Sequence, residues 1–169
     1  MPRRHPALPD GVPLPPLCVL LLPRPLEAFA LRDQAEDLLR APGAVAVEPA
    51  RISYETLARV PGVVAERLAA GQARRLSLPG TPRAIAMFDP LQYLLARALL
   101  AASPDAELWY GATDAEGSLH DAALARSALT FSTAATEDVP SRNRTLFERM
   151  EGLGIHSGRL GSERLAAPD

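Results

Sequence analysis

The chain has 169 residues, enough for one hydrophobic core and too few for two ordinary domains. Its formal net charge of −2 and pI near 5.9 give no general attraction for phosphate polymers or anionic lipid surfaces, so we expect neither nucleic acid nor a membrane as a partner. All 18 basic residues are arginine and alanine is abundant, a pattern that indicates GC-rich coding bias. Single arginines are therefore weak evidence for anion recognition. The single cysteine, Cys18, excludes an internal disulfide and is interpreted as a small buried hydrophobe.

No apolar run reaches the roughly 18 residues that span a bilayer. The start of the chain lacks the order of charge, apolar core and cleavage site that marks a signal peptide, so we expect a cytoplasmic location. Residues 1–16 are dense in proline and show no periodicity, which predicts an extended or disordered leader. An interaction arm is the alternative to a frayed terminus without a role.

The first half of the chain alternates strand and helix patterns. Residues 17–22 are apolar at every position, as in a strand that helices cover on both faces. Residues 26–40 form an amphipathic helical pattern, and residues 44–47 predict a second short strand. Residues 54–76 are helical in pattern, with Pro61 dividing the segment into two pieces.

A strand-helix-strand unit follows the loop expected at residues 78–82. The apolar run at residues 84–88 predicts the third strand, and residues 108–110 predict the fourth. Between them, apolar residues recur at the spacing of one helix face, namely at Leu91, Leu94, Leu95, Ala98 and Leu99. The short connections favour a right-handed parallel crossover.

The start of that helix carries a chemical signal. Asp89 can accept a hydrogen bond from a free backbone N–H of the first turn, and Pro90 suits the first helical position. Gln92 can reach back as in a capping box. A helix cap therefore explains Asp89, although ligands of open α/β sheets also bind at the ends of strands.

The last third of the chain supplies a helical pattern at residues 117–126, a fifth strand at residues 128–132 and a final helix at residues 144–152. Residues 155–169 show no period and are expected to form an irregular tail. The resulting fold class is α/β, with a Rossmann-like parallel sheet of about five strands, helices on both faces, and a single domain at residues 17–154.

The simplest strand order for such a sheet is 3-2-1-4-5. In that order the loops after the first and fourth strands flank the crevice at the carboxyl edge. Arg24 and residues 110–114 would then face the same space. Trp109 and Tyr110 point to opposite faces of their strand, so at least one of them belongs to the core, and we expect Tyr110 to lie nearer the crevice. The alternative for Thr113 or Asp114 is that it begins the next helix.

Several motifs are absent from the sequence. No G-x-G-x-x-G follows the first strand, and Pro23 and Pro25 stiffen the loop where a dinucleotide needs close backbone approach. We therefore expect no cofactor. The three histidines, His5, His120 and His156, have no metal-like spacing, so we expect no metal site, and His120 is interpreted as a solvated helix position.

A resemblance to a known family rests on three segments, A-I-A-M-F-D-P-L-Q-Y-L-L-A-R-A-L-L, E-L-W-Y-G-A-T-D and A-L-A-R-S-A-L-T-F-S-T-A. In this order they resemble the N-terminal, acceptor-side domain of GT-B-fold, family-4-like glycosyltransferases of the teichuronic-acid-biosynthesis type. The family's motif positions correspond to Phe88-Asp89-Pro90, to Tyr110 with Asp114, and to Phe131-Ser132. The resemblance covers residues 17–136.

The resemblance implies transfer of a sugar from a nucleotide-sugar donor to an acceptor hydroxyl. It makes Asp114 or Asp89 the carboxylate that orients or deprotonates that hydroxyl. The substrate-binding candidates are Arg24, Tyr110, Gly111, Thr113 and Ser132. Because the family's nucleotide-sugar contacts lie mainly in a second domain, the expected partners are a sugar acceptor and a separate donor-binding domain or chain, and the isolated chain is expected to be inactive. The alternative is a non-catalytic α/β binding or interaction protein.

Overall fold

The five strands form one parallel sheet in the order β2-β1-β3-β4-β5. The computed structural model describes residues 14–22, 31–47, 52–112, 116–132 and 139–155, without side-chain detail at 132 and 139–143. The strands are β1 (Pro16–Leu21), β2 (Ala44–Val47), β3 (Thr81–Met87), β4 (Glu107–Ala112) and β5 (Leu129–Ser132). Every neighbouring pair is parallel, which confirms the expected strands as neighbours in a parallel sheet.

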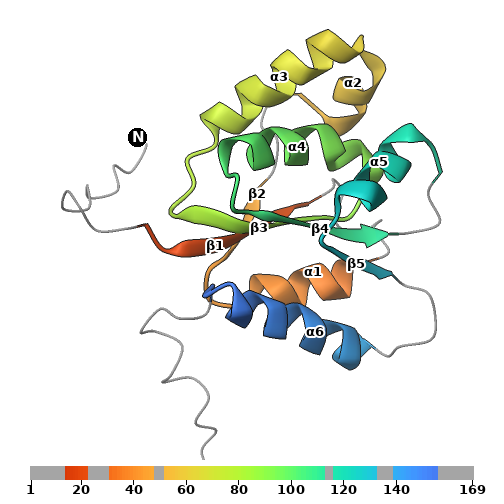
Figure 1. The fold of residues 1–169 in the computed structure, drawn as a ribbon. Coiled ribbons are helices and arrows are strands. Elements are labelled where there is room, and N and C mark those ends of the chain that lie inside the picture. The colour runs from red at the N-terminus through yellow and green to blue at the C-terminus, as the bar shows by residue number, and fades with distance from the viewer. Residues whose placement is uncertain (1–13, 23–30, 48–51, 113–115, 133–138, 156–169) are drawn as a thin grey trace, which may run out of the picture.

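Helices cover both faces of this sheet (Figure 1). One face carries α1 (Arg32–Leu39) and α6 (Val139–Gly152). The other carries α2 (Tyr54–Arg59), α3 (Gly62–Arg75), α4 (Tyr93–Ala102) and α5 (Ser118–Arg126), with the short 3-10 turn η2 (Pro90–Gln92) leading into α4. Side chains of one strand alternate between two hydrophobic cores, one on each face of the sheet. We call them the α2–α5 core, which contains Val19, and the α1/α6 core, which contains Leu20. The expected single α/β domain is confirmed.

The strand order differs from the expected 3-2-1-4-5. β1 pairs with β2 on one side and with β3 on the other, so β3 occupies the centre of the sheet. Burial explains this arrangement, because residues 84–87 of β3 are wholly buried, whereas β2 is short and partly exposed and suits an edge. The crossover direction therefore changes between β1 and β3, and the ligand-binding switch point of a doubly wound sheet lies there.

Several ends of strands and helices also differ from those expected from the sequence. Thr81 and Pro82, expected in a loop, belong to β3, because Thr81 N donates a 2.8 Å hydrogen bond to Pro15 O and extends the pairing with β1. α6 begins at Val139, earlier than residue 144. The folded unit also includes Ile155, expected in the tail, which is buried in the α1/α6 core.

The local stop and start signals are confirmed. α2 ends at Arg59 and α3 begins at Gly62, with Pro61 between them as expected. Cys18 is buried in β1, and burial raises the pKa of its thiol to about 12, so it behaves as a packed hydrophobe.

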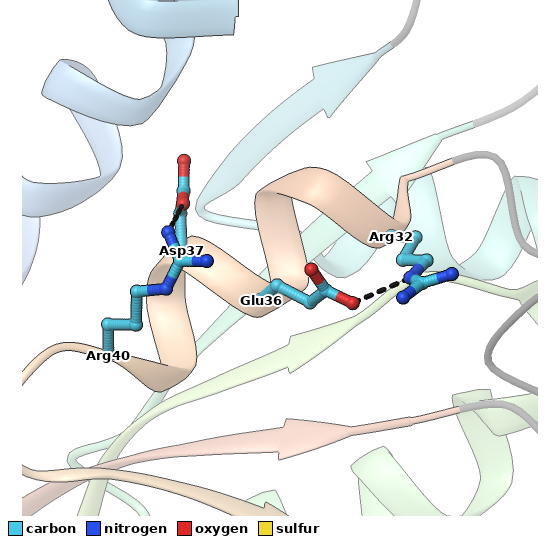
Figure 2. A network of polar contacts seen from close by, with 4 residues as sticks. All are labelled: Arg32, Glu36, Asp37 and Arg40. Atoms are coloured by element: carbon cyan, nitrogen blue, oxygen red, sulfur yellow. Dashed lines mark hydrogen bonds and ion pairs between the residues drawn. The ribbon is translucent and has the colours of Figure 1, made fainter.

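The solvent side of α1 carries two ion pairs, which Figure 2 shows. Arg32 Nε lies 2.6 Å from Glu36 Oε1, and Arg40 lies 2.8 Å from Asp37 Oδ1. All four side chains are more than one-third exposed, so each pair contributes only about 0.3–0.5 kcal/mol. Burial of the opposite side of α1 is the larger contribution to holding this helix on the sheet.

A charged contact fastens α6 to β4. Arg149 Nε donates a 2.9 Å hydrogen bond to Glu107 Oε2, and the Nη2 nitrogen of Arg149 pairs with Oε1 of the same carboxylate. Trp109 Nε1 donates to Glu107 Oε2 at 3.1 Å. The hydrogen bond from Arg149 holds the pKa of Glu107 below its usual value, although partial burial opposes the shift.

Stability should therefore depend on pH through Glu107. A lowered folded pKa means that the stabilisation from Glu107 is present above the unfolded pKa of about 4.3 and is lost as pH falls through the folded value.

We expect Glu107→Gln to reduce the free energy of unfolding by about 1–2 kcal/mol near neutral pH. In urea titrations from neutral pH to about pH 3, the gap to wild type should close at the acid end. Glu66→Gln, at an exposed pair with Arg97, is the control with little effect. A gap that stays constant or widens in acid contradicts the assignment.

Candidate functional site

The carboxyl edge of β3 and β4 carries the described part of the candidate site. Arg24, Thr113 and Asp114, three of the residues expected there, lie outside the residues that the structure describes. Ser132 is the last residue of β5 and so ends at the same edge, but its side chain is not described. Asp89, Tyr110 and Gly111 lie within the described residues.

Asp89 follows β3 directly and caps the turn that leads into α4. Its Oδ1 accepts a 2.8 Å hydrogen bond from Leu91 N, and the Gln92 side chain accepts in return from Asp89 N at 3.2 Å. The expected capping box is therefore confirmed. The cap leaves the carboxylate able to accept further hydrogen bonds, because its two oxygens together offer about four lone-pair sites. Asp89 is also half-buried at the switch-point edge, so the capping and binding interpretations are compatible.

Gln92 fixes the backbone of this loop from inside the protein. It is fully buried, and its Oε1 accepts hydrogen bonds from Phe88 N at 2.7 Å and from Asp89 N at 3.2 Å. Two N–H donors on one atom determine which end of the amide is oxygen. Its Nε2 has no hydrogen-bond partner in the described chain. Gln92 thus holds Asp89 in place at the edge of the sheet.

Tyr110 and Trp109 point to opposite faces of β4, as expected from strand alternation. Trp109 lies in the α1/α6 core, whereas Tyr110 lies on the α2–α5 side. The Tyr110 hydroxyl is 2.9 Å from Nδ1 of His120, and the two rings meet edge to face with centroids 5.6 Å apart. Burial, and then the negative charge of Asp89, raise the pKa of Tyr110 to about 12. Tyr110 and His120 are in direct contact, and the turn η2, which Asp89 caps, packs against α5, which carries His120. We refer to Asp89, Tyr110 and His120 as the carboxyl-edge cluster.

His120 is the residue that sequence reasoning missed. The expectation of a solvated helix position is wrong, because the ring is half-buried and hydrogen-bonded to Tyr110. No spacing rule links a strand residue to a residue in the next helix, so the contact had no sequence signal. The helix itself begins at Ser118, with Gly117 at the N-cap and a φ of 115°. Neither Thr113 nor Asp114 therefore begins that helix.

Gly111 has a packing reason for lacking a side chain. A Cβ at this position would lie 2.6 Å from Leu31 Cδ1 and 2.8 Å from Phe131 Cε2. Both neighbours belong to the α1/α6 core, so the absent side chain makes room for them on that face of β4. A binding role for Gly111 stays a prediction.

Metal ligands do not gather anywhere in the described part of the chain, where no group of three or more His, Cys, Asp or Glu side chains could hold an ion. Among the described helices, none has both the length and the apolar character to cross a bilayer. No protein-family model, curated protein or solved structure matches the chain.

The chemistry of the cluster suits a hydroxyl-bearing ligand. A carboxylate accepts hydrogen bonds, whereas an imidazole can donate one and accept another. A hydroxyl both donates and accepts, so it complements these two groups together. Tyr110 is buried and already bonded to His120, which leaves Asp89 and His120 as the half-buried members able to meet a ligand.

Proposed function

We propose that this chain supplies the acceptor-side surface of a GT-B-type glycosyltransferase and binds a sugar acceptor through its hydroxyl groups at the carboxyl-edge cluster. The observation that carries the proposal is that Asp89, at the end of β3 beside the switch point, acts through its charge on the Tyr110 hydroxyl, which is hydrogen-bonded to His120 on α5. The family resemblance of the segments around Asp89 and Tyr110 supports the same assignment.

The reaction assigns a specific role to the carboxylate. The acceptor oxygen forms a bond to the anomeric carbon of the donor sugar, and the bond from that carbon to the nucleotide phosphate breaks, with its electron pair leaving on the phosphate. The hydroxyl proton goes to a carboxylate acting as general base. Asp89 fills this role in the described part of the chain, and Asp114 is the other carboxylate that the resemblance implies. The donor is bound by a separate domain or chain.

The proposal is tested by ligand binding to the purified chain. A panel of aryl glycosides is screened by saturation-transfer NMR, and hits are titrated by calorimetry against wild type and Asp89→Asn. We expect at least one glycoside to bind, and Asp89→Asn to weaken it about tenfold through loss of the charge-assisted hydrogen bond. Thermal stability should be nearly unchanged, because asparagine caps a helix as well as aspartate does. Asp105→Asn, an exposed carboxylate before β4, is the matched control.

Two outcomes contradict the proposal. The first is an absence of glycoside binding at millimolar concentration, or equal binding by wild type and Asp89→Asn. The second is micromolar binding of a nucleotide sugar to the chain alone, because the proposed site serves the acceptor and not the donor.

A further inference from the structure

We infer that Tyr110 is a positioning residue that holds His120 in the neutral tautomer with its proton on Nε2, so that His120 acts at the site as a hydrogen-bond donor and not as the base. The tautomer follows from the contacts within the cluster. The role toward a ligand rests on the proposed function and deepens it, because it assigns hydrogen-bond donation to His120 and proton acceptance to Asp89.

Only two arrangements satisfy the 2.9 Å contact between the Tyr110 hydroxyl and Nδ1 of a neutral His120. In the first, Tyr110 donates its proton to an unprotonated Nδ1. In the second, a protonated Nδ1 donates to the Tyr110 oxygen, and the hydroxyl proton must find another acceptor. The choice between them depends on what else surrounds the hydroxyl.

The surroundings of the hydroxyl favour the first arrangement. Tyr110 is fully buried, and in the described chain its hydroxyl has a hydrogen bond to His120 alone. With a pKa raised to about 12, the hydroxyl keeps its proton at any physiological pH. The second arrangement leaves this buried O–H without a partner, whereas the first leaves only an oxygen lone pair unused. The usual penalty for an unmade buried hydrogen bond favours the first arrangement on the order of tenfold.

Protonation at Nε2 determines what the half-buried ring offers to a ligand. Nε2–H is a donor with no hydrogen bond to a described residue, and it complements an oxygen lone pair on a sugar or a phosphate. Asp89 is then the only member of the cluster that accepts a proton from a hydroxyl. In the proposed reaction, His120 binds and orients an oxygen of the acceptor while Asp89 takes the proton.

The tautomer is measured directly by long-range proton–nitrogen NMR on the full chain labelled at histidine, at about pH 8, where ordinary imidazoles are neutral. His120→Gln assigns its signals among the three histidines of the chain. In wild type we expect Nδ1 at the shift of an unprotonated nitrogen and Nε2 at that of a protonated one. In Tyr110→Phe the two shifts should move toward each other as both tautomers become populated. Tyr93→Phe, another buried tyrosine on the same side of the sheet, should leave them unchanged.

The same variants test the role toward the ligand. If Tyr110→Phe lowers the donor tautomer to about half of the population, the affinity for a bound aryl glycoside should fall about twofold. A protonated Nδ1 in wild type, or a Tyr110→Phe spectrum identical to wild type, overturns the inference. The wild-type spectrum decides the tautomer even if Tyr110→Phe does not fold. It also needs no glycoside, so failure of the proposed function and failure of the tautomer assignment remain distinguishable.

Discussion

Replacement of Leu20 by alanine is expected to lower the free energy of unfolding by about 2–5 kcal/mol. Leu20 is 0% exposed near the carboxyl end of β1, which has β2 on one side and β3 on the other. Truncation removes buried apolar surface and leaves a cavity that strands on both sides prevent from closing.

The matched control is the same substitution at Leu124, which is 39% exposed on α5. Because alanine is a good helix former and little burial is lost, Leu124→Ala should change stability by no more than about 0.5 kcal/mol. Urea denaturation of the two variants under identical conditions measures the difference. Similar losses at the two sites would contradict the interior position of β1 between β2 and β3.

Gly43→Ala, in the turn between α1 and β2, is expected to be strongly destabilising. Gly43 has a φ of 81°, where side chains are strained, and a Cβ would lie 2.7 Å from Ile155 O and 3.3 Å from Pro16 O. Both close atoms are backbone and cannot rotate away. Backbone strain and the forced displacement together are expected to lower the free energy of unfolding by about 2–4 kcal/mol.

Gly71→Ala provides the control with the opposite sign. Gly71 lies within α3, and a Cβ there would meet nothing within 4 Å. Alanine should stabilise the helix by about 0.5–1 kcal/mol, because it restricts the unfolded chain more than glycine does. Thermal and urea unfolding of both variants therefore test one chemical change in two environments. A stabilising Gly43→Ala would refute the close approach of Ile155.

Much of the fold was predictable because its signals are local. Continuous apolar runs predicted strands buried on both faces, and Pro61 predicted the break between α2 and α3. The capping box at Asp89 and Gln92 involves groups within three residues, so their order along the chain already brings them together. Asp89 was accordingly the one site candidate whose contacts could be anticipated.

The sequence by itself determined the class of fold, the strands and helices, and the cap that holds Asp89 at the end of β3. The tertiary structure decided the place of β3 between β1 and β4, because a parallel crossover fixes handedness and leaves open which neighbour a strand joins. That placement moved the switch point from the first and fourth strands to β1 and β3. The contact between Tyr110 and His120 also emerged only in three dimensions, because it depends on how α5 packs back on β4 and on no spacing along the chain.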